Sequence, residues 1–230
     1  MKPKKDNLLI RKYETLVRLL IALPHKPFTL DAWKAYNRHG TAQVIRMIKE
    51  LGIAPRHLVD VGANESQWAY WLMKEWPDMR LDSFEPLHRF RPQGVIHRLA
   101  LSDNEADLRM VSRPGGDSHI AEAGDTSVKA VRFDSLPFEV LRPAICKIDC
   151  ENFTSKALCG FGDRINEFEV VVVEMLNEWP RKGECLWFKN QQPEIWSFML
   201  KHGFTGRLVD FPYSIHAITN YDMAFYKPRS

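Results

Sequence analysis

The stretch Val59-Asp60-Val61-Gly62-Ala63-Asn64-Glu65-Ser66-Gln67-Trp68 decides how the chain is predicted to fold. It stands where the short apolar run 57–61 gives way to a segment, 66–76, that has helical spacing and is ended by Pro77. Glycine at the end of a strand lets the backbone turn sharply and lets a ligand approach closely. The helix that follows offers free N–H groups and the positive end of its dipole. We therefore expect a ligand-binding strand–turn–helix unit here.

Strands and helices alternate through the rest of the chain. The run 170–173 is four consecutive valines, which is typical of a central strand buried on both faces. Further strands are predicted at 80–84, 95–101, 108–111, 128–133, 145–148, 168–175, 207–211 and 223–226, with a helix at 192–202. Such alternation predicts a doubly wound α/β fold.

The charge is divided unevenly along the 230 residues. The net charge is +3, but residues 1–56 carry 12 Lys and Arg against 4 Asp and Glu, which is +8, and the remainder carries −5. We interpret residues 1–55 as a basic helical extension, with helices at 6–23, 29–37 and 41–52 (Thr41 as the cap of the last), and residues 56–230 as the main domain. Three roles of the extension stay open: packing on the domain over the cofactor pocket, forming a homodimer, or contacting an anionic membrane or nucleic acid.

The cysteines and the apolar runs bear on the compartment. Cys146, Cys150, Cys159 and Cys185 form no CxxC pair, so a zinc site is disfavoured and buried free thiols are expected. Free thiols suit a reducing cytoplasm. No signal peptide is recognisable, and no stretch approaches the roughly 20 apolar residues of a membrane span.

The residues around the glycine turn narrow the choice of cofactor. Glu85 follows the second strand about twenty residues on, where a carboxylate can accept hydrogen bonds from both hydroxyls of a ribose. Of the G-x-G-x-x-G pattern only Gly62 is present, and there is no Walker lysine, so a dinucleotide or a triphosphate is disfavoured. S-adenosylmethionine has no phosphate, and Asp60 can help to hold its ammonium group. This cofactor is therefore favoured.

Six short signatures in order resemble the FkbM-type methyltransferases over about residues 42–227. They are Asp60-Val-Gly-Ala-Asn64, Phe84-Glu-Pro86, Ala100-Leu-Ser-Asp103, Phe133-Asp-Ser-Leu136, Lys147-Ile-Asp-Cys-Glu151 and Val172-Val-Glu174. The resemblance implies a class I methyltransferase (Rossmann-like) fold, with a mostly parallel seven-stranded sheet, and methyl transfer from S-adenosylmethionine to a hydroxyl of a sugar or polyketide. The cofactor-binding residues it implies are Asp60, Gly62, Ala63, Asn64, Ser66, Glu85, Pro86, Leu101, Ser102 and Asp103, with residues 101–103 framing the adenine.

Acidic residues after two later strands are the candidates for catalysis. Asp149 and Glu151 are two positions apart, so in an extended backbone both carboxylates face one pocket. A carboxylate or a histidine can remove the proton of an acceptor hydroxyl. Asp149 is the predicted base with Glu151 as its helper, Glu174 is predicted to hold a substrate hydroxyl, and His119 to act as base or substrate clamp; His216 is a weaker candidate. These oxygens could also bind a divalent cation, although nothing in their spacing demands a metal.

The chain departs from the family pattern at three places. Ser66 and Asn152 replace glycines, and the helix between the second and third strands is lost or reduced to 87–94. We expect Ser66 to cap the following helix and Asn152 to accept a left-handed backbone. The sequence thus predicts a cytoplasmic O-methyltransferase for a small-molecule or glycan acceptor, with no nucleic acid expected. A nucleic-acid methyltransferase and a non-catalytic binding module that keeps the fold remain alternatives.

Overall fold

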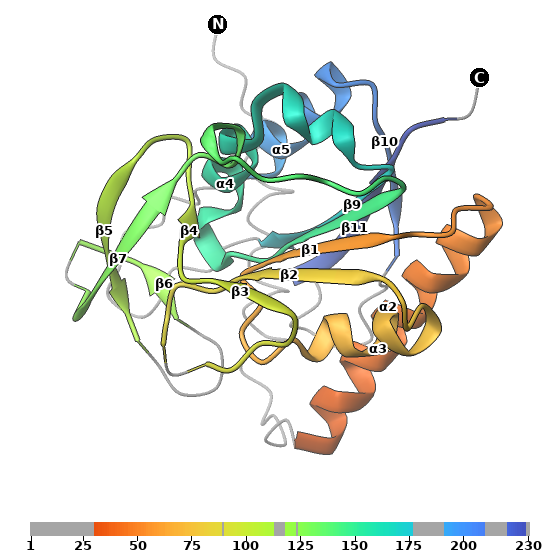
Figure 1. The fold of residues 1–230 in the computed structure, drawn as a ribbon, viewed down its shortest axis with the longest axis horizontal. Coiled ribbons are helices and arrows are strands. Elements are labelled where there is room, and N and C mark those ends of the chain that lie inside the picture. The colour runs from red at the N-terminus through yellow and green to blue at the C-terminus, as the bar shows by residue number, and fades with distance from the viewer. Residues whose placement is uncertain are drawn as a thin grey trace, which may run out of the picture.

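The computed structural model describes residues 30–88, 90–112, 118–122, 124–176, 191–209 and 220–228. Its main feature is a seven-stranded sheet in the order β10-β11-β9-β8-β1-β2-β3 (Figure 1). The strands are β1 His57–Val61, β2 Arg80–Phe84, β3 Val95–His97, β8 Ala144–Ile148, β9 Val170–Leu176, β10 Thr205–Leu208 and β11 Asn220–Tyr226. The pairs from β3 to β9 are all parallel, whereas β11 is antiparallel to both of its neighbours. The predicted doubly wound, mostly parallel sheet is confirmed.

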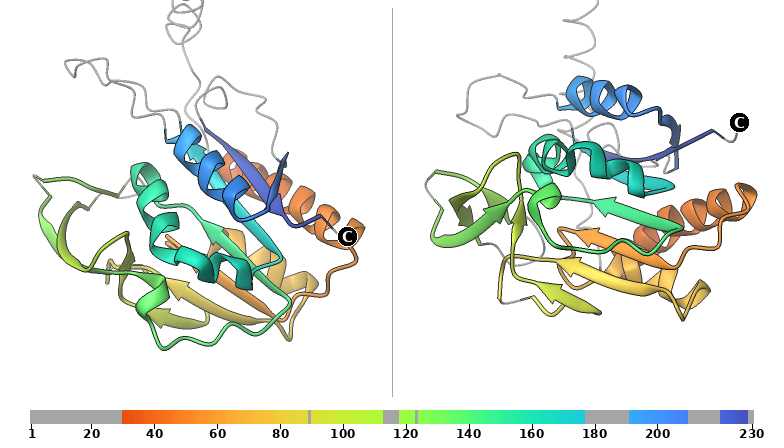
Figure 2. Two further views of the ribbon diagram at one scale, coloured as in Figure 1. Left: turned by 90° about the horizontal axis from the view of Figure 1, so that it is seen from above. Right: turned by 45° about the horizontal axis from the view of Figure 1, so that its top comes forward.

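Helices cover both faces of this sheet. The bounds are α2 Leu30–Glu50, α3 Gln67–Glu75, α4 Thr154–Phe161 and α5 Gln192–Lys201. Helices α2 and α3 lie on one face and α4 and α5 on the other (Figures 1 and 2). Two separate apolar clusters fill the two interfaces. Every residue of β1 and β8 is buried, which explains why both segments have nearly continuous apolar sequences.

The order of the strands reverses beside β1, because β2 pairs with it on one side and β8 on the other. Open α/β sheets bind ligands at such a switch point, outside the carboxyl ends of the strands. Four acids stand in or just after the last residues of the strands that meet there, namely Asp60, Glu85, Asp149 and Glu174. The fold therefore gathers the main candidates of the sequence analysis.

A second sheet of four strands, in the order β4-β7-β5-β6, lies beyond the carboxyl ends of the central strands (Figure 1). Its strands are β4 Ala100–Leu101, β5 Ala106–Val111, β6 His119–Ile120 and β7 Thr126–Val131. The prediction of a single strand at 95–101 was wrong, because this segment forms two strands. The chain leaves the main sheet after His97 and enters the second sheet at Ala100. The guanidinium of Arg98, at this crossing, donates to the carbonyls of Glu85, Leu87 and Phe90.

Those three bonds fix the segment between β2 and β3. The structure has no helix in the described residues of 85–94, in keeping with the expected loss. Three short 3-10 turns complete the described fold: η1 Phe133–Ser135, η2 Glu151–Phe153 and η3 Gly162–Glu167. Neither these turns nor helix α4 was predicted from the sequence.

Helix α2 corrects the prediction of two helices at 29–37 and 41–52. It is continuous, and Thr41 lies fully buried inside it instead of capping its start. Val44, Met47 and Ile48 are buried with Leu72 of α3 in one core cluster. This packing outweighs the penalty of about 1 kcal/mol for Gly40 inside a helix. The predicted helix 6–23 lies outside the described residues, and the domain boundary at residue 55 stays a prediction.

Three of the cysteines fall within the described residues. Cys146 is buried, Cys150 is half-buried and Cys159 is exposed, so the expectation of buried thiols is wrong for Cys159. In the part of the chain that the structure describes, no helix has both the length and the apolar character needed to cross a membrane.

Candidate active site

The glycine turn joins the ends of β1, β2 and β8. Gly62 has a φ of +77°, and its N–H donates to the carbonyl of Phe84 over 2.9 Å. A Cβ at Gly62 would lie 1.8 Å from the carbonyl oxygen of Asp149. The positive φ confirms the predicted sharp turn, and the group that approaches the glycine closely in the structure is the end of β8. Ala63 is buried beside it, and its N–H also points to the Phe84 carbonyl.

Ser66 does not act as the predicted cap. It stands at the N-cap position of α3 with a φ of +53°, and its side chain makes no capping hydrogen bond. Its hydroxyl instead accepts from the N–H of Gln93, so Ser66 ties α3 to the segment that leads into β3. The prediction for Asn152 was also wrong, because the left-handed residue is Glu151, with a φ of +49°.

Asp60 is buried beneath the turn, with an exposed fraction of 3 %. Its Oδ2 atom is buried and has no hydrogen-bond partner. Burial raises the pKa of Asp60 to about 7, the Lys147 ammonium opposes this, and the Asp149 and Glu85 carboxylates add to it. Near neutral pH this carboxyl group therefore stands between its two protonation states, and a positive charge beside it would favour the ionised one.

Glu85 is held as a fixed acceptor. Its Oε2 accepts from the N–H of Asn64 over 3.0 Å, and its Oε1 accepts from the N–H of Leu87 over 2.9 Å. The side chain is buried, and Pro86 beside it is half-buried. Each carboxylate oxygen has a second lone pair, so the group can still accept hydrogen bonds from a ligand.

Asp149 and Glu174 form a close pair of carboxyl groups. Burial would raise the pKa of Asp149, but the Lys147 ammonium, 3.0 Å from its Oδ2, and a hydrogen bond with Glu174 hold that pKa below its ordinary value. Burial, followed by the neighbouring Asp149, raises the pKa of Glu174 well above its ordinary value. The two carboxyl groups therefore titrate as a coupled pair, in which the surroundings favour the ionised form of Asp149 and the protonated form of Glu174.

Glu151 completes the acidic cluster that was expected. One carboxylate oxygen from each of Asp149, Glu151 and Glu174 lies within 4.8 Å of the others. The two acids after β8 thus converge, although through the turn η2 and not through an extended backbone. Three carboxylates at this spacing could hold a cation. The cation that the described residues place beside them is the ammonium of Lys147.

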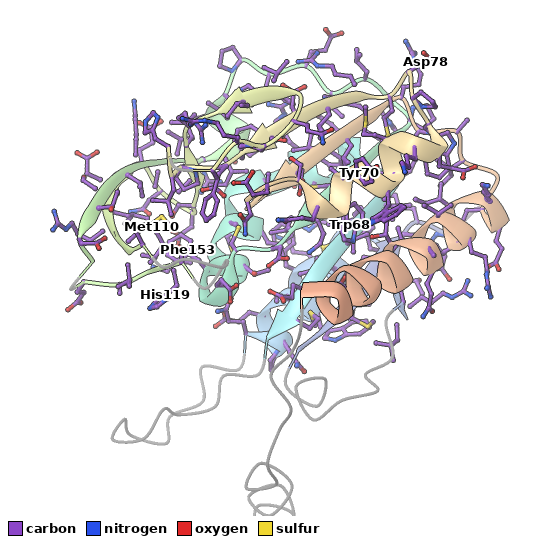
Figure 3. The ribbon with its side chains drawn as sticks, turned by 90° about the horizontal axis from the view of Figure 1, so that it is seen from below. Trp68, Tyr70, Asp78, Met110, His119 and Phe153 are labelled. Carbon is purple, nitrogen blue, oxygen red and sulfur yellow. The ribbon has the colours of Figure 1, made fainter. Side chains whose placement is uncertain are left out.

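His119 approaches this cluster from the second sheet. Strand β6, which begins with His119, packs against η2, which begins with Glu151. Figure 3 shows His119 near Phe153 of η2 and Met110 of β5. The structure therefore brings His119 to the same end of the main sheet as the acids. His216 lies outside the described residues.

The predicted adenine-binding residues belong to the joint between the two sheets. Leu101 and Ser102 are buried and Asp103 is exposed. The Ser102 N–H donates to the carbonyl of Val131, and its hydroxyl bonds to the side chains of Asp103 and Asn104. These bonds hold the end of β4 in the second sheet, and the adenine role of residues 101–103 stays a prediction.

Lys147, Asp222 and Trp68 are site residues that the sequence analysis did not assign. Lys147 lies in β8, where its position within an apolar run was the available signal. Its ammonium lies 3.7 Å from Oδ1 of Asp222, on β11, and 5.9 Å from the centre of the Trp68 ring. No pattern in the sequence indicated Asp222, because this residue lies beside the site only through the pairing of β11 with β9.

Three buried side-chain atoms lack a hydrogen-bond partner in the described residues, and all three surround Lys147. They are Oδ2 of Asp60, Nε1 of Trp68 and Oε2 of Glu174. Lys147 interacts electrostatically with both acids, and its ammonium lies over the Trp68 ring. Unpartnered buried polar atoms are rare in folded proteins and each requires an explanation. Their grouping at the switch point indicates a site for a polar ligand.

No protein-family model matches the sequence, and no curated protein matches it either. Several solved methyltransferase structures align with the chain. Magnesium protoporphyrin IX methyltransferase from Synechocystis PCC 6803 with bound SAM has 7 % identity and a TM-score of 0.48, over 99 % of this chain and 100 % of that one. The plantazolicin methyltransferase BpumL in complex with SAH has 10 % identity and a TM-score of 0.48, over 96 % and 98 %. The methyltransferase domain of bacterial CtHen1-C has 10 % identity and a TM-score of 0.46, over 84 % and 100 %. Similarities this remote leave the reaction to be argued from the chain's own residues.

Proposed function

We propose that the protein is an S-adenosylmethionine-dependent O-methyltransferase that acts on a hydroxyl of a glycan or secondary metabolite. The observation that carries the proposal is the group of unpartnered buried atoms around Lys147 at the switch point. Two of the three are carboxylate oxygens, and Lys147 is the only buried lysine or arginine in the described residues. A ligand with positive charge complements such a site, and S-adenosylmethionine carries a sulfonium and an ammonium.

The cofactor fits the residues that surround the turn. Asp60 and Trp68 supply one acceptor and one donor without partners, for the two charged groups of the methionine part. Glu85 supplies a carboxylate that two backbone N–H groups hold in place, as an acceptor for the ribose hydroxyls. The turn has no second glycine for a pyrophosphate.

The carboxyl pair fits the chemistry of the transfer. When bound, S-adenosylmethionine supplies a methyl group on positively charged sulfur. The acceptor oxygen must lie about 3–3.5 Å from that carbon, in line with the bond to sulfur. Asp149 would accept the proton of the acceptor hydroxyl while the hydroxyl oxygen takes up the methyl group that the cofactor would supply, and the electron pair of the broken S–C bond would stay on sulfur. Glu151, Glu174 and His119 are proposed to hold the acceptor, a small molecule or glycan, beside this base.

The test of the cofactor is calorimetric titration of the full chain with S-adenosylmethionine and S-adenosylhomocysteine. Glu85→Gln keeps the shape of the side chain but removes its charge, and we expect about ten- to hundredfold weaker binding of both ligands. The matched control is Glu139→Gln, an exposed position, which should bind as the unaltered protein does. Absence of binding at millimolar ligand would exclude the enzyme and leave the binding-module alternative.

The test of the base uses Asp149→Asn with the same titration. We expect this variant to bind both ligands and to release no S-adenosylhomocysteine from S-adenosylmethionine in the presence of hydroxylated glycans or polyketides that the unaltered protein methylates. Equal loss of affinity in Asp149→Asn and Glu85→Gln would contradict the separate roles. Binding that weakens steeply with salt to nucleic acid would support the nucleic-acid alternative instead.

A further inference from the structure

Lys147 is a charged side chain placed in the centre of the main sheet. It is 2 % exposed, and its neighbours across the sheet are Asp60 on β1 and Val172 on β9. Burial alone would lower the pKa of this ammonium, but Asp149, Asp222 and Glu174 together raise it above its ordinary value, which favours the charged form. A buried charge is costly unless it is paired, and this one is paired with more than one acid.

The ammonium contacts the two members of the carboxyl pair unequally. Its Nζ lies 3.0 Å from Oδ2 of Asp149, which is within hydrogen-bonding distance. Oε2 of Glu174 is buried with no partner at all. A hydrogen bond between two carboxyl groups requires one proton. The ammonium lowers the free energy of ionisation more at Asp149, which it contacts, than at Glu174.

We propose that Lys147 is a positioning residue: it holds Asp149 as the ionised member of the carboxyl pair and assigns the shared proton to Glu174. This deepens the proposed function, on which its catalytic meaning rests, because it leaves Asp149 free to accept the proton of the acceptor hydroxyl. It also leaves Glu174 with a hydroxyl that donates to Asp149, which fixes the direction in which the base points.

The other charged groups at the pair work in the same direction. Asp222 on β11 shares the Lys147 ammonium, and Glu151 on η2 and Asp60 on β1 add negative charge. More negative charge around the pair favours retention of a single proton on it. Among the described residues Lys147 alone brings positive charge to this point from within the sheet, so it decides which carboxyl group ionises.

The test is a side-chain carboxyl titration by ¹³C NMR on the full chain without any ligand, so that it is independent of cofactor binding. In Lys147→Met we expect the lower of the two apparent pKa values of the pair to rise by about one to three units, because a charge within 4 Å has been lost. Lys147→Arg keeps the charge and should keep the lower value. Lys129→Met removes an exposed lysine of β7 and should leave both values unchanged.

A second variant serves if Lys147→Met does not fold. In Asp149→Asn the like charge beside Glu174 is removed, so the Glu174 pKa should fall by about one unit or more. An unchanged titration of the pair in folded Lys147→Met, or of Glu174 in Asp149→Asn, would overturn the assignment. Either result would leave the calorimetric test of S-adenosylmethionine binding unaffected.

Discussion

Folding buries the carboxyl group of Asp60, and this burial makes the stability of the protein depend on pH. Its pKa rises from an ordinary 3.8 to about 7 on folding, chiefly through burial. The neutral form is therefore favoured in the folded state: the resulting stability is complete below pH 3.8 and is lost as the pH rises through 7. Asp60→Asn cannot ionise, so we expect it to raise the free energy of unfolding by up to about 4 kcal/mol at pH 8 and by less at pH 5.

Urea denaturation at several pH values measures this difference. Asp78→Asn, in the exposed turn between α3 and β2 (Figure 3), is the matched control and should change stability little at either pH. A gain in Asp60→Asn that does not grow between pH 5 and pH 8 would contradict the raised pKa. If Asp60→Asn stabilises the protein, then Asp60 does not serve the stability of the fold, which agrees with its predicted role in binding the cofactor.

Sequence reasoning selected the candidate acids because each lies at or just after the end of a strand, and strand ends can be recognised. Asp60, Glu85 and Asp149 are of this kind. It did not single out Lys147, since a lysine in an apolar run can equally be an edge residue whose ammonium reaches water. Only the tertiary structure shows that β8 is central and that Asp222 arrives beside it from the end of the chain.

Strands β1, β2 and β3 are joined at their core by the carboxylate of Asp82 as well as by the ladder of backbone bonds. Asp82 accepts from Nε2 of His57 over 2.9 Å, from Nε2 of His97 over 2.7 Å and from Nε of Arg80 over 2.5 Å. Nδ1 of His57 accepts from the N–H of Leu141, so this neutral histidine carries its proton on Nε2. Burial would raise the pKa of Asp82, but the three donors lower it strongly.

We expect Asp82→Asn to lower the free energy of unfolding at pH 7 by about 3–5 kcal/mol, because the buried His57 and the partly exposed Arg80 and His97 lose their ionised acceptor. Since the folded pKa is depressed, the stability is present above pH 3.8 and is lost as the pH falls below it. The difference between the variant and the unaltered protein should therefore shrink in acid. Denaturation curves at pH 7 and at a pH well below 3.8 check this, with the exposed Asp107→Asn as control. A constant difference would argue against an ionised Asp82.

The elements that could be predicted are those with a strong apolar pattern. Strand β9 was predicted from its run of valines, and β1, β2 and β8 from apolar runs that end in polar turns. The second sheet was not recognised as a sheet, because β5 alternates between half-buried and exposed residues, and β4 and β6 have two residues each. Strands this short take their structure from their neighbours and not from their own sequence.

The two sheets together place the proposed site, with acids from the main sheet and His119 from the second. The residues after position 56 carry a net charge of −5, and the acids of the site lie among them. The basic residues 1–56 lie outside the six methyltransferase-like signatures, so their charge of +8 is weak evidence for a nucleic-acid partner. The geometry of the site depends instead on how the second sheet is fastened to the main one.

Gly160 of α4 marks one such fastening point. A Cβ at this position would lie 2.0 Å from the carbonyl oxygen of Ser102, which follows β4 of the second sheet. Two effects of Gly160→Ala oppose each other. Helix propensity alone would stabilise the protein by about 1 kcal/mol. Forcing a methyl group into packed backbone typically costs about 1–3 kcal/mol, and more where the backbone cannot shift.

Because the neighbour is a backbone oxygen, we expect the steric effect to exceed the propensity effect and Gly160→Ala to lower the free energy of unfolding by up to about 2 kcal/mol after the propensity gain is subtracted. Cys159→Ala, the exposed neighbour on the same helix, has only the propensity effect and should stabilise by a few tenths of a kcal/mol. Urea denaturation measures whether the free energy of unfolding falls in Gly160→Ala and rises in Cys159→Ala. A gain of stability in Gly160→Ala would mean that the second sheet can move away from α4, and with it His119 from the acidic cluster.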